Sequence, residues 1–187
     1  LVSEILKRST DIDKMKLNSL LHEGLTGKHF DVVEILLRHG ADPNAVNSHG
    51  LSAIASINDS KFGKLLVTSG AKIVFLDACR LGLTEAVEEL ASRNPEFVRE
   101  HHKGKLGIHY AAIGGHAETI KVLLRLKMPI NASDEDGNTP LAWACVYGYS
   151  KVVEELLNNG ADPNSSNKKG DYPLHNALRN RLENIAI

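Results

Sequence analysis

The fold is decided by residues 139–164, which read TPLAWACVYGYSKVVEELLNNGADPN. Thr139 suits the start of a helix, because its hydroxyl can accept a hydrogen bond from a backbone N–H that has no partner inside the helix. Pro140 follows at the first helical position, where its missing N–H does no harm. Gly148 can end this helix in the left-handed conformation. The first half of the stretch therefore predicts one short helix with both ends marked.

The second half of the stretch predicts another helix, over 151–158. Gly160 ends it, and Pro163 starts an extended turn because proline disfavours helical backbone at the residue before it. The apolar residues expected to face inward are Leu141, Ala144 and Cys145 on the first helix and Val152, Val153, Leu156 and Leu157 on the second. The stretch is therefore a helix–turn–helix unit followed by an extended loop.

Copies of this unit recur along the chain. The apolar residue near the start of the first helix recurs at Leu21, Ile54, Phe75, Ile108, Leu141 and Leu174, in steps of 33, 21, 33, 33 and 33. A period of 33 with threonine–proline–leucine–histidine punctuation resembles the ankyrin repeat. The resemblance covers nearly the whole chain, with five to six repeats of which one is degenerate. Each repeat is expected to bury its apolar face against its neighbours.

The resemblance implies an all-α ankyrin-repeat solenoid of antiparallel helix pairs with β-hairpin or loop fingers, irregular around 51–75. A finger is the segment that joins one helix pair to the next. We expect a single domain over 1–187, divided as follows: 1–16 (remnant of a preceding repeat), 17–46, 47–73 (degenerate), 74–98, 99–131, 132–164 and 165–187 (truncated).

The step of 21 marks a departure from the repeat. Residues 51–66 predict a compressed helix pair around the turn Asn58-Asp59-Ser60. The finger before 74–79 is expected to be missing, with a kink or looser packing near 55–75. Sequence drift with a shortened loop and a functional bend are both open explanations. At the ends, 1–12 resemble a second helix and 181–187 the start of another, which suggests that the natural protein extends further.

Composition excludes several classes of protein. Apolar residues make up 42% and charged residues 24%, which argues against disorder. The net charge of −1 lacks the basic excess typical of nucleic-acid binders. No apolar run approaches the ~20 residues that a membrane span needs, so we expect no membrane insertion. Two cysteines are too few for a disulfide-stapled module, which favours a reducing compartment, cytoplasmic or nuclear.

No catalytic or metal-binding constellation stands out. The resemblance implies that His22, His29, His109, His116 and His175 hydrogen-bond to backbone between repeats, and the two cysteines, Cys79 and Cys145, occupy small core positions. Asp134-Glu135-Asp136-Gly137 lacks the ligands of a calcium loop and predicts a solvated acidic finger tip. No phosphate-binding glycine loop is present. We therefore expect no enzyme activity in this chain, no metal, no cofactor and no small-molecule substrate.

The resemblance also implies a binding surface, since ankyrin proteins generally bind through the fingers and the exposed face of the first helices. The predicted partner-binding residues are Arg80, Leu81, Ile113, Val146, Tyr147 and Arg179 on first helices, and His101, His102, Lys103, Asp134, Glu135, Asp136, Lys168 and Lys169 on fingers. A finger ridge of alternating charge suits a protein partner better than a polyanion. Tyr110 and Trp143 are expected to be partly buried packing residues, with direct partner contact as the alternative.

The leading functional hypothesis is a protein–protein interaction module that acts as adaptor, scaffold or inhibitor. One alternative is the recognition segment of a larger enzyme or channel. Another is a secreted bacterial effector that mimics host ankyrin proteins. Nucleic-acid binding ranks last.

Overall fold

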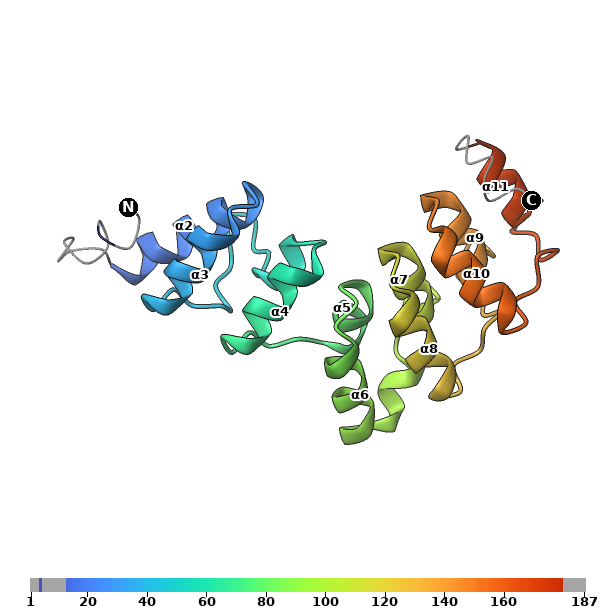
Figure 1. Ribbon diagram of the computed structural model, residues 1–187, viewed down its shortest axis with the longest axis horizontal. Coiled ribbons are helices and arrows are strands. Elements are labelled where there is room, and N and C mark those ends of the chain that lie inside the picture. Colours follow the sequence, from blue (N-terminus) through green and yellow to red (C-terminus); the bar gives the residue numbers. More distant parts are fainter. Residues whose placement is uncertain (1–3, 5–12, 180–187) are drawn as a thin grey trace. The chain divides into compact units, whose positions relative to one another are not determined.

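The computed structural model describes residue 4 and residues 13–179 of the chain (Figure 1). The chain divides into two compact units, Leu1–Ile73 and Val74–Ile187. The expected terminal helices at 1–12 and 181–187 lie outside the described residues, apart from Glu4. In the part that is described, no helix is both long enough and apolar enough to cross a membrane.

In its described part, residues 13–73, unit 1 contains one complete helix pair, a single 3-10 turn and a further helix. The elements are α2 (Lys14–Thr26), α3 (Phe30–Arg38), η1 (Ile54–Ser56) and α4 (Ser60–Thr68). Asp13 caps α2 by accepting from the backbone N–H of Lys16 at 2.8 Å, and Asp59 caps α4 by accepting from that of Lys61 at 2.7 Å. Carboxylates at these positions pair backbone donors that a helix leaves free.

The degenerate repeat is compressed as the sequence predicts. A three-residue turn, η1, stands where a first helix would be, and α4 follows after the cap at Asp59. Ile54 and Ile57 are buried there. The predicted kink near 55–75 concerns orientation along the chain and stays a prediction.

Unit 2 is built from helix pairs. First helices are α5 (Phe75–Arg80), α7 (Gly107–Gly114), α9 (Pro140–Tyr147) and α11 (Pro173–Arg179); second helices are α6 (Thr84–Arg93), α8 (Ala117–Arg125) and α10 (Ser150–Asn158). The first helices lie side by side in one row and the second helices in another (Figure 1). Small residues, among them Ala111, Ala144 and Cys145, are buried where first helices meet and allow this close approach.

The predicted helix signals of residues 139–164 are confirmed. The hydroxyl of Thr139 accepts from the backbone N–H of Ala142 at 3.2 Å, Pro140 is the first residue of α9, and Gly148 ends the helix at φ 73°. One prediction is wrong. Leu157 does not face inward but is 43% exposed, because α10 buries only the side of Val152, Val153 and Leu156.

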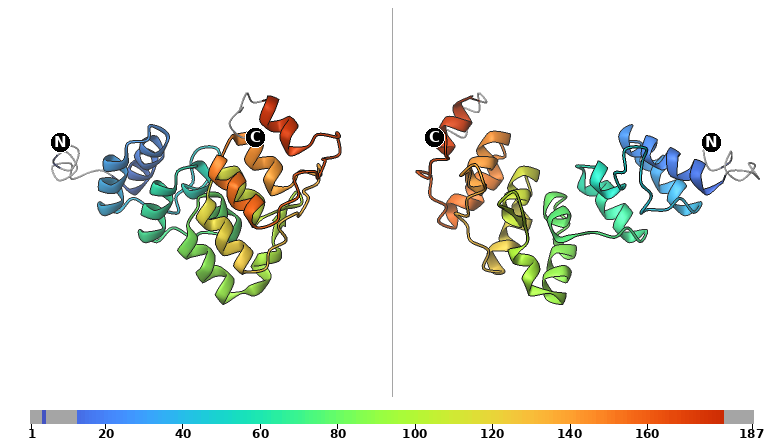
Figure 2. Two further views of the ribbon diagram at one scale, coloured as in Figure 1. Left: turned by 45° about the vertical axis from the view of Figure 1, so that its right-hand side comes forward. Right: turned by 180° about the vertical axis from the view of Figure 1, so that it is seen from behind.

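The fingers of unit 2 project on one side of its helices (Figure 2). The 3-10 helix η2 (Pro95–Arg99) leads into a short hairpin in which β1 (His101–His102) pairs antiparallel with β2 (Lys105–Leu106). As predicted, no finger separates Gly70 from α5. Neighbouring fingers are joined through backbone: Glu135 N–H donates to Lys103 O at 3.3 Å, and Lys168 N–H donates to Asp136 O at 2.9 Å.

One turn recurs in three fingers. A side-chain oxygen of Asn47, Asp134 and Asn167 accepts the backbone N–H groups two and four residues further along, at 2.9–3.0 Å. Asparagine and aspartate favour such turns because their short side chains reach the following backbone. These three fingers are therefore shaped locally by one residue each, and in unit 2 the backbones of neighbouring fingers are also held to one another.

Candidate functional site

The candidate site is the inner face of unit 2, the surface of its first helices on the finger side. Its residues are Asp77 and Arg80 on α5, Tyr110 and Ile113 on α7, Trp143, Val146 and Tyr147 on α9, and Arg179 on α11. Residues three or four apart share one face of a helix, and the repeat of 33 places equivalent residues of successive helices in line. The spacing of these residues in the sequence therefore predicts that they share one surface.

Three aromatic rings form a strip across this face: Trp143, Tyr147 and Tyr149. The centroids of Trp143 and Tyr147 are 6.1 Å apart with an interplanar angle of 24°, and those of Tyr147 and Tyr149 are 6.1 Å apart at 19°. Tyr147 is 50% exposed and Tyr149 37% exposed. The ring of Tyr149 lies close against Gly115, since a Cβ there would meet the ring at 2.9 Å. The aromatic strip is thus a preformed, partly exposed apolar surface.

The carboxylate of Asp134 organises one end of the strip. Its Oδ2 accepts from the indole Nε1–H of Trp143 at 3.0 Å and from the ammonium of Lys105 at 3.1 Å. The Lys105 ammonium also lies 5.0 Å from the centre of the Trp143 ring. Burial alone would raise the pKa of Asp134, but hydrogen bonds from Asn138, Lys105 and Trp143 outweigh it and lower the pKa below its ordinary value.

The expectation that Asp134 is a solvated finger tip is therefore wrong. Asp134 is only 5% exposed, because its turn directs the carboxylate inward toward Trp143. It positions the strip and is not accessible to a partner. The prediction that Trp143 and Tyr110 are partly buried is confirmed, since both are half-buried.

The other end of the inner face carries an ion pair. Arg80 donates to Oδ1 of Asp77 from Nε at 3.2 Å and from Nη2 at 2.9 Å. Burial raises the pKa of the neighbouring Tyr110. The expectation that Leu81 is exposed is wrong: it is fully buried, because α5 ends at Arg80 and Leu81 lies in the turn to α6.

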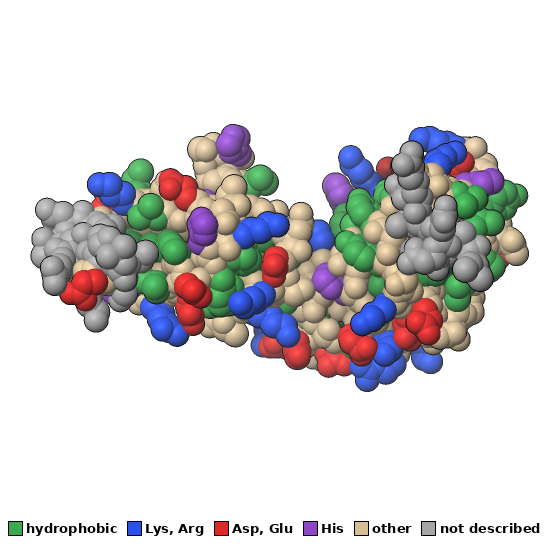
Figure 3. Space-filling model, turned by 45° about the horizontal axis from the view of Figure 1, so that its top comes forward, with side chains coloured by type: hydrophobic (Ala, Val, Ile, Leu, Met, Phe, Trp, Pro, Cys, Tyr) green, Lys and Arg blue, Asp and Glu red, His purple; other side chains and the backbone are tan. Residues whose placement is uncertain are grey.

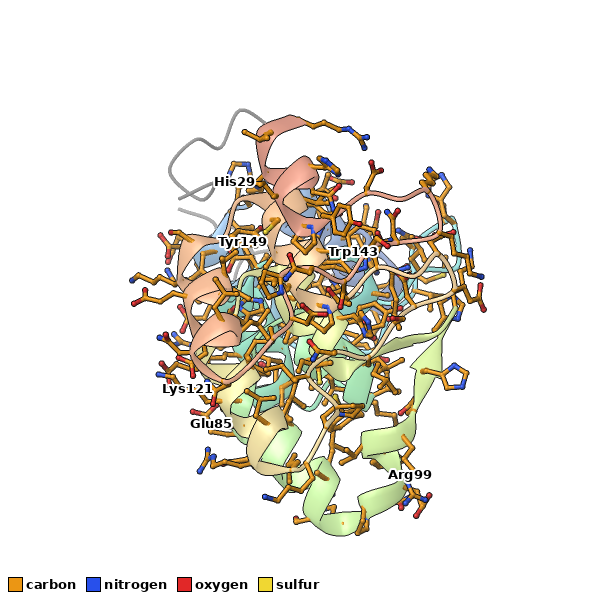
Figure 4. The ribbon with its side chains drawn as sticks, turned by 90° about the vertical axis from the view of Figure 1, so that its right-hand side faces the viewer. His29, Glu85, Arg99, Lys121, Trp143 and Tyr149 are labelled. Carbon is orange, nitrogen blue, oxygen red and sulfur yellow. The ribbon has the colours of Figure 1, made fainter. Side chains whose placement is uncertain are left out.

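The other first-helix residues were expected to be exposed, and this holds for Arg179 but not for Ile113 and Val146. Ile113 and Val146 are half-buried on the inner face, and Arg179 is exposed but donates to both carboxylate oxygens of Asp171, at 2.8 Å and 2.6 Å. The exposed finger residues are His101, His102, Lys103, Glu135, Asp136, Lys168 and Lys169. Their role in binding stays a prediction. In Figure 4, Lys121 and Glu85 on the second helices lie on the opposite side of unit 2 from Arg99 at the finger side.

Several charges on the second helices of unit 2 are paired with one another. Arg125 contacts Glu88 at 3.1 Å, and Lys121 contacts Glu118 at 2.8 Å and Glu155 at 3.7 Å. Figure 3 shows acidic and basic side chains mixed along this part of the molecule. Exposed pairs of this kind contribute little to stability, and a mixed surface of both signs gives no single-sign patch for a polyanion.

Three of the five histidines that were predicted to hydrogen-bond to backbone do so through Nε2. Nε2 of His22 donates to Ala45 O at 3.1 Å, that of His109 to Ala132 O at 3.0 Å, and that of His116 to Arg80 O at 2.9 Å. His29 is exposed, and His175 accepts from the backbone N–H of Tyr172 in its own repeat. No group of three or more His, Cys, Asp or Glu that could hold a metal ion occurs among residues 4 and 13–179.

Sequence reasoning missed Tyr149 and Lys105 as parts of the site. Tyr149 occupies the position of His29 and His116 in the repeat, so an aromatic ring at a histidine position was the available signal. Lys105 stands in the sequence among the basic residues of the finger before α7, yet its side chain is only 18% exposed. No sequence pattern pairs it with Asp134, which lies in the following finger.

A hollow of about 780 Å³ lies in unit 1 between α2 and the finger around Val46. Met15 is 82% exposed at its rim and Val46 62% exposed. His22 and His49 also line it. The inner side of unit 1 therefore has exposed apolar residues as well, but no ring contact resembling the aromatic strip joins the residues of this hollow.

Stacked helix pairs with fingers along one side define a helical repeat protein. A family model of three consecutive ankyrin repeats matches residues 74–167, and a model of one ankyrin repeat matches residues 16–48. The chain belongs to the ankyrin-repeat family, whose repeats are non-catalytic protein–protein interaction modules. The two matches leave residues 49–73 between them, where the repeat is compressed.

Relatives are found among larger proteins. The E3 ubiquitin-protein ligase XBAT33 of Arabidopsis thaliana is 30% identical over 125 residues, 65% of this chain and 20% of the relative. The putative ankyrin repeat protein FPV024 of fowlpox virus is 28% identical over 129 residues, 67% of this chain and 18% of the relative. The tyrosine-protein kinase HTK16 of Hydra vulgaris is 27% identical over 149 residues, 74% of this chain and 16% of the relative. This chain thus spans about a fifth of the length of the curated relatives that it matches.

Proposed function

We propose that this chain binds a segment of another protein on the inner face of unit 2 and acts as an adaptor, scaffold or inhibitor. The observation that carries the proposal is the aromatic strip, in which Tyr147 and Tyr149 stay exposed although their rings are stacked in a fixed array. Exposed aromatic anchors are enriched at the centres of protein interfaces, because a tyrosine ring buries much area and has few rotatable bonds.

The surroundings of the strip support the same function. Half-buried aliphatic residues, Val146 and Ile113, lie beside it on the same face. Charged finger tips, such as Lys168 and Glu135, lie at the edge. An apolar centre with a polar rim is the usual anatomy of a specific protein interface.

Quantitative affinity capture tests the proposal. The unmodified chain, the double variant Val146→Ala/Tyr147→Ala and the finger variant His102→Ala are each used as bait, and captured proteins are compared by mass spectrometry. Leu157→Ala is the matched control, since Leu157 is a similarly exposed apolar residue on a second helix. We expect a partner that the unmodified chain and Leu157→Ala retain and the double variant loses. If the double variant and Leu157→Ala capture this partner equally well, the proposed binding surface is contradicted.

A second candidate function is a recognition segment within a larger protein. The relatives favour it, since a ubiquitin ligase and a tyrosine kinase each contain a match that covers only a fifth or less of their length. Sequencing of the transcript on both sides of this chain tests the idea. A further catalytic domain is expected, and a start codon and a stop codon directly flanking residues 1–187 would contradict it. The bacterial effector stays a sequence-based prediction.

A further inference from the structure

We propose that the segment bound on the aromatic strip is an uncharged, apolar peptide segment, and that ring contact rather than charge attraction holds it. This inference rests on the proposed function and specifies the partner's chemistry at the same site. It follows from how the charges of the inner face are paired.

Three cations of the first helices and of the hairpin beside them have a carboxylate partner within the chain. Arg80 is paired with Asp77 at 2.9 Å, Lys105 with Asp134 at 3.1 Å, and Arg179 with Asp171 at 2.6 Å. The first two pairs are largely shielded from solvent: the side chains of Arg80 and Lys105 are 18% exposed, that of Asp77 26% and that of Asp134 0%. The inner face therefore offers a partner little net charge.

Pairing of this kind penalises a charged partner. A carboxylate or phosphate laid across the strip would lose water and would have to compete with Asp77 or Asp134 for a cation that is already hydrogen-bonded. An ion that loses hydration without gaining a counter-ion is strongly disfavoured. A cationic segment meets the converse obstacle, because each of these carboxylates is already neutralised. An uncharged segment avoids both costs.

The strip offers an apolar segment two kinds of contact. The rings of Tyr147 and Tyr149 present faces and edges against which aliphatic, proline or aromatic side chains can pack, together with Val146. Their phenol O–H groups lie on exposed residues and can donate to the carbonyl groups of a bound backbone. The Trp143 indole N–H, in contrast, is committed to Asp134. The charged finger tips lie at the rim, where they act on the rate of encounter more than on the lifetime of the complex.

The chain contains its own reporter for this site, because Trp143 is its single tryptophan. A library of random short peptides displayed on phage is selected on the full chain. Recovered peptides are then synthesised and titrated against the chain while Trp143 fluorescence is followed. We expect recovered sequences rich in apolar residues with net charge near zero. Their affinity should change less than about threefold between ~0.05 M and ~1 M salt.

Variants connect the measured binding to the strip. Tyr147→Ala should weaken binding of the recovered peptides about tenfold or more, whereas Tyr147→Phe, which keeps the ring, should weaken it only a few-fold. The finger variant Lys168→Ala/Lys169→Ala should change it less than about twofold. Circular dichroism and urea unfolding of each variant check that the fold is retained.

Other outcomes separate this inference from the proposed function. Strongly charged peptides that bind at the strip, with an affinity that falls more than about tenfold in high salt, would overturn the inference and leave the binding surface intact. Loss of binding in the finger variant but not in Tyr147→Ala would overturn it as well. A selection that returns no peptide binding at the strip would also overturn it, and the capture experiment then decides on the proposed function independently.

Discussion

The indole N–H of Trp143 donates to the carboxylate of Asp134 at 3.0 Å, and this bond fixes the finger at 134–138 to the aromatic strip on α9. The same carboxylate holds the finger turn and pairs with Lys105 of the preceding finger. One side chain thus connects two fingers and the centre of the candidate site.

Replacement of Asp134 by asparagine tests this connection. Asn47 and Asn167 form the same turn, so Asp134→Asn keeps the finger but turns an amide toward two donors, Lys105 and Trp143. We expect the free energy of unfolding to fall by about 3 kcal/mol, as when a buried ion pair loses one partner. Urea unfolding followed by Trp143 fluorescence measures it. The exposed neighbour variant Asp136→Asn should change stability by less than about 0.5 kcal/mol, and equal losses would contradict the role of Asp134.

Close contact between fingers predicts different effects of alanine at two glycines. Gly104 has φ 70°, and a Cβ there would meet the backbone nitrogen of Glu135 at 2.7 Å. Gly170 has φ 80°, but nothing lies within 4 Å of its Cβ position. Both variants strain the backbone, so Gly104→Ala should destabilise by about 1–3 kcal/mol more than Gly170→Ala. Thermal and urea unfolding compare them, and similar losses would mean that the fingers separate freely.

Stability is expected to fall in mild acid. Burial lowers the pKa of His109 and of His116 in the folded chain, while their unfolded pKa is about 6.5. Below that pH the unfolded chain takes up the protons first, so stability that is fully present above about pH 6.5 is lost as the pH falls toward the folded pKa values. Urea midpoints measured between about pH 7.5 and about pH 5.5 should decrease by an amount equivalent to ~1–2 kcal/mol.

The variant His109→Asn identifies the group responsible. It should be less stable than the unmodified chain at neutral pH, because two backbone hydrogen bonds change, yet its stability should depend less on pH. His102→Ala, at an exposed residue, should keep the full pH dependence. An unchanged slope in His109→Asn would contradict this assignment.

Both cysteines should resist thiol reagents in the folded chain. Burial raises the pKa of Cys145 to about 11 and that of Cys79 further, and only the thiolate reacts rapidly. Colorimetric titration near pH 8 should show negligible reaction until urea is added, and then two thiols. Ser166→Cys places a third thiol at an exposed finger residue and should react at once. Rapid reaction of the unmodified chain would indicate frequent opening of the core.

Much of the fold could be predicted from the sequence because its determinants are local and recur. Thr139, Pro140 and Gly148 act within one helix, and the histidine at the start of a first helix reaches backbone at a fixed distance along the chain. The compressed repeat was predictable from a step of 21 in place of 33. Each of these signals depends only on spacing and residue type.

The errors at the site share another origin. Asp134 was expected in solvent because it stands in a polar run, but the direction of its carboxylate depends on Lys105, which belongs to the preceding finger. Leu81 was expected to be exposed because Gly114 and Tyr147 are its equivalents, yet α5 ends one residue earlier. The prediction that Leu157 faces inward used helical spacing, which does not show how wide the buried face of α10 is. Contacts between successive repeats therefore decide what spacing alone does not.

The three-residue turn η1 has an energetic consequence. A single turn presents less apolar area to adjacent segments than a full helix does, and repeat arrays transmit folding cooperativity only between nearest neighbours. Within unit 1, α4 should therefore open locally while the pair α2–α3 stays folded. Amide hydrogen exchange should show lower protection in Ser60–Thr68 than in Phe30–Arg38.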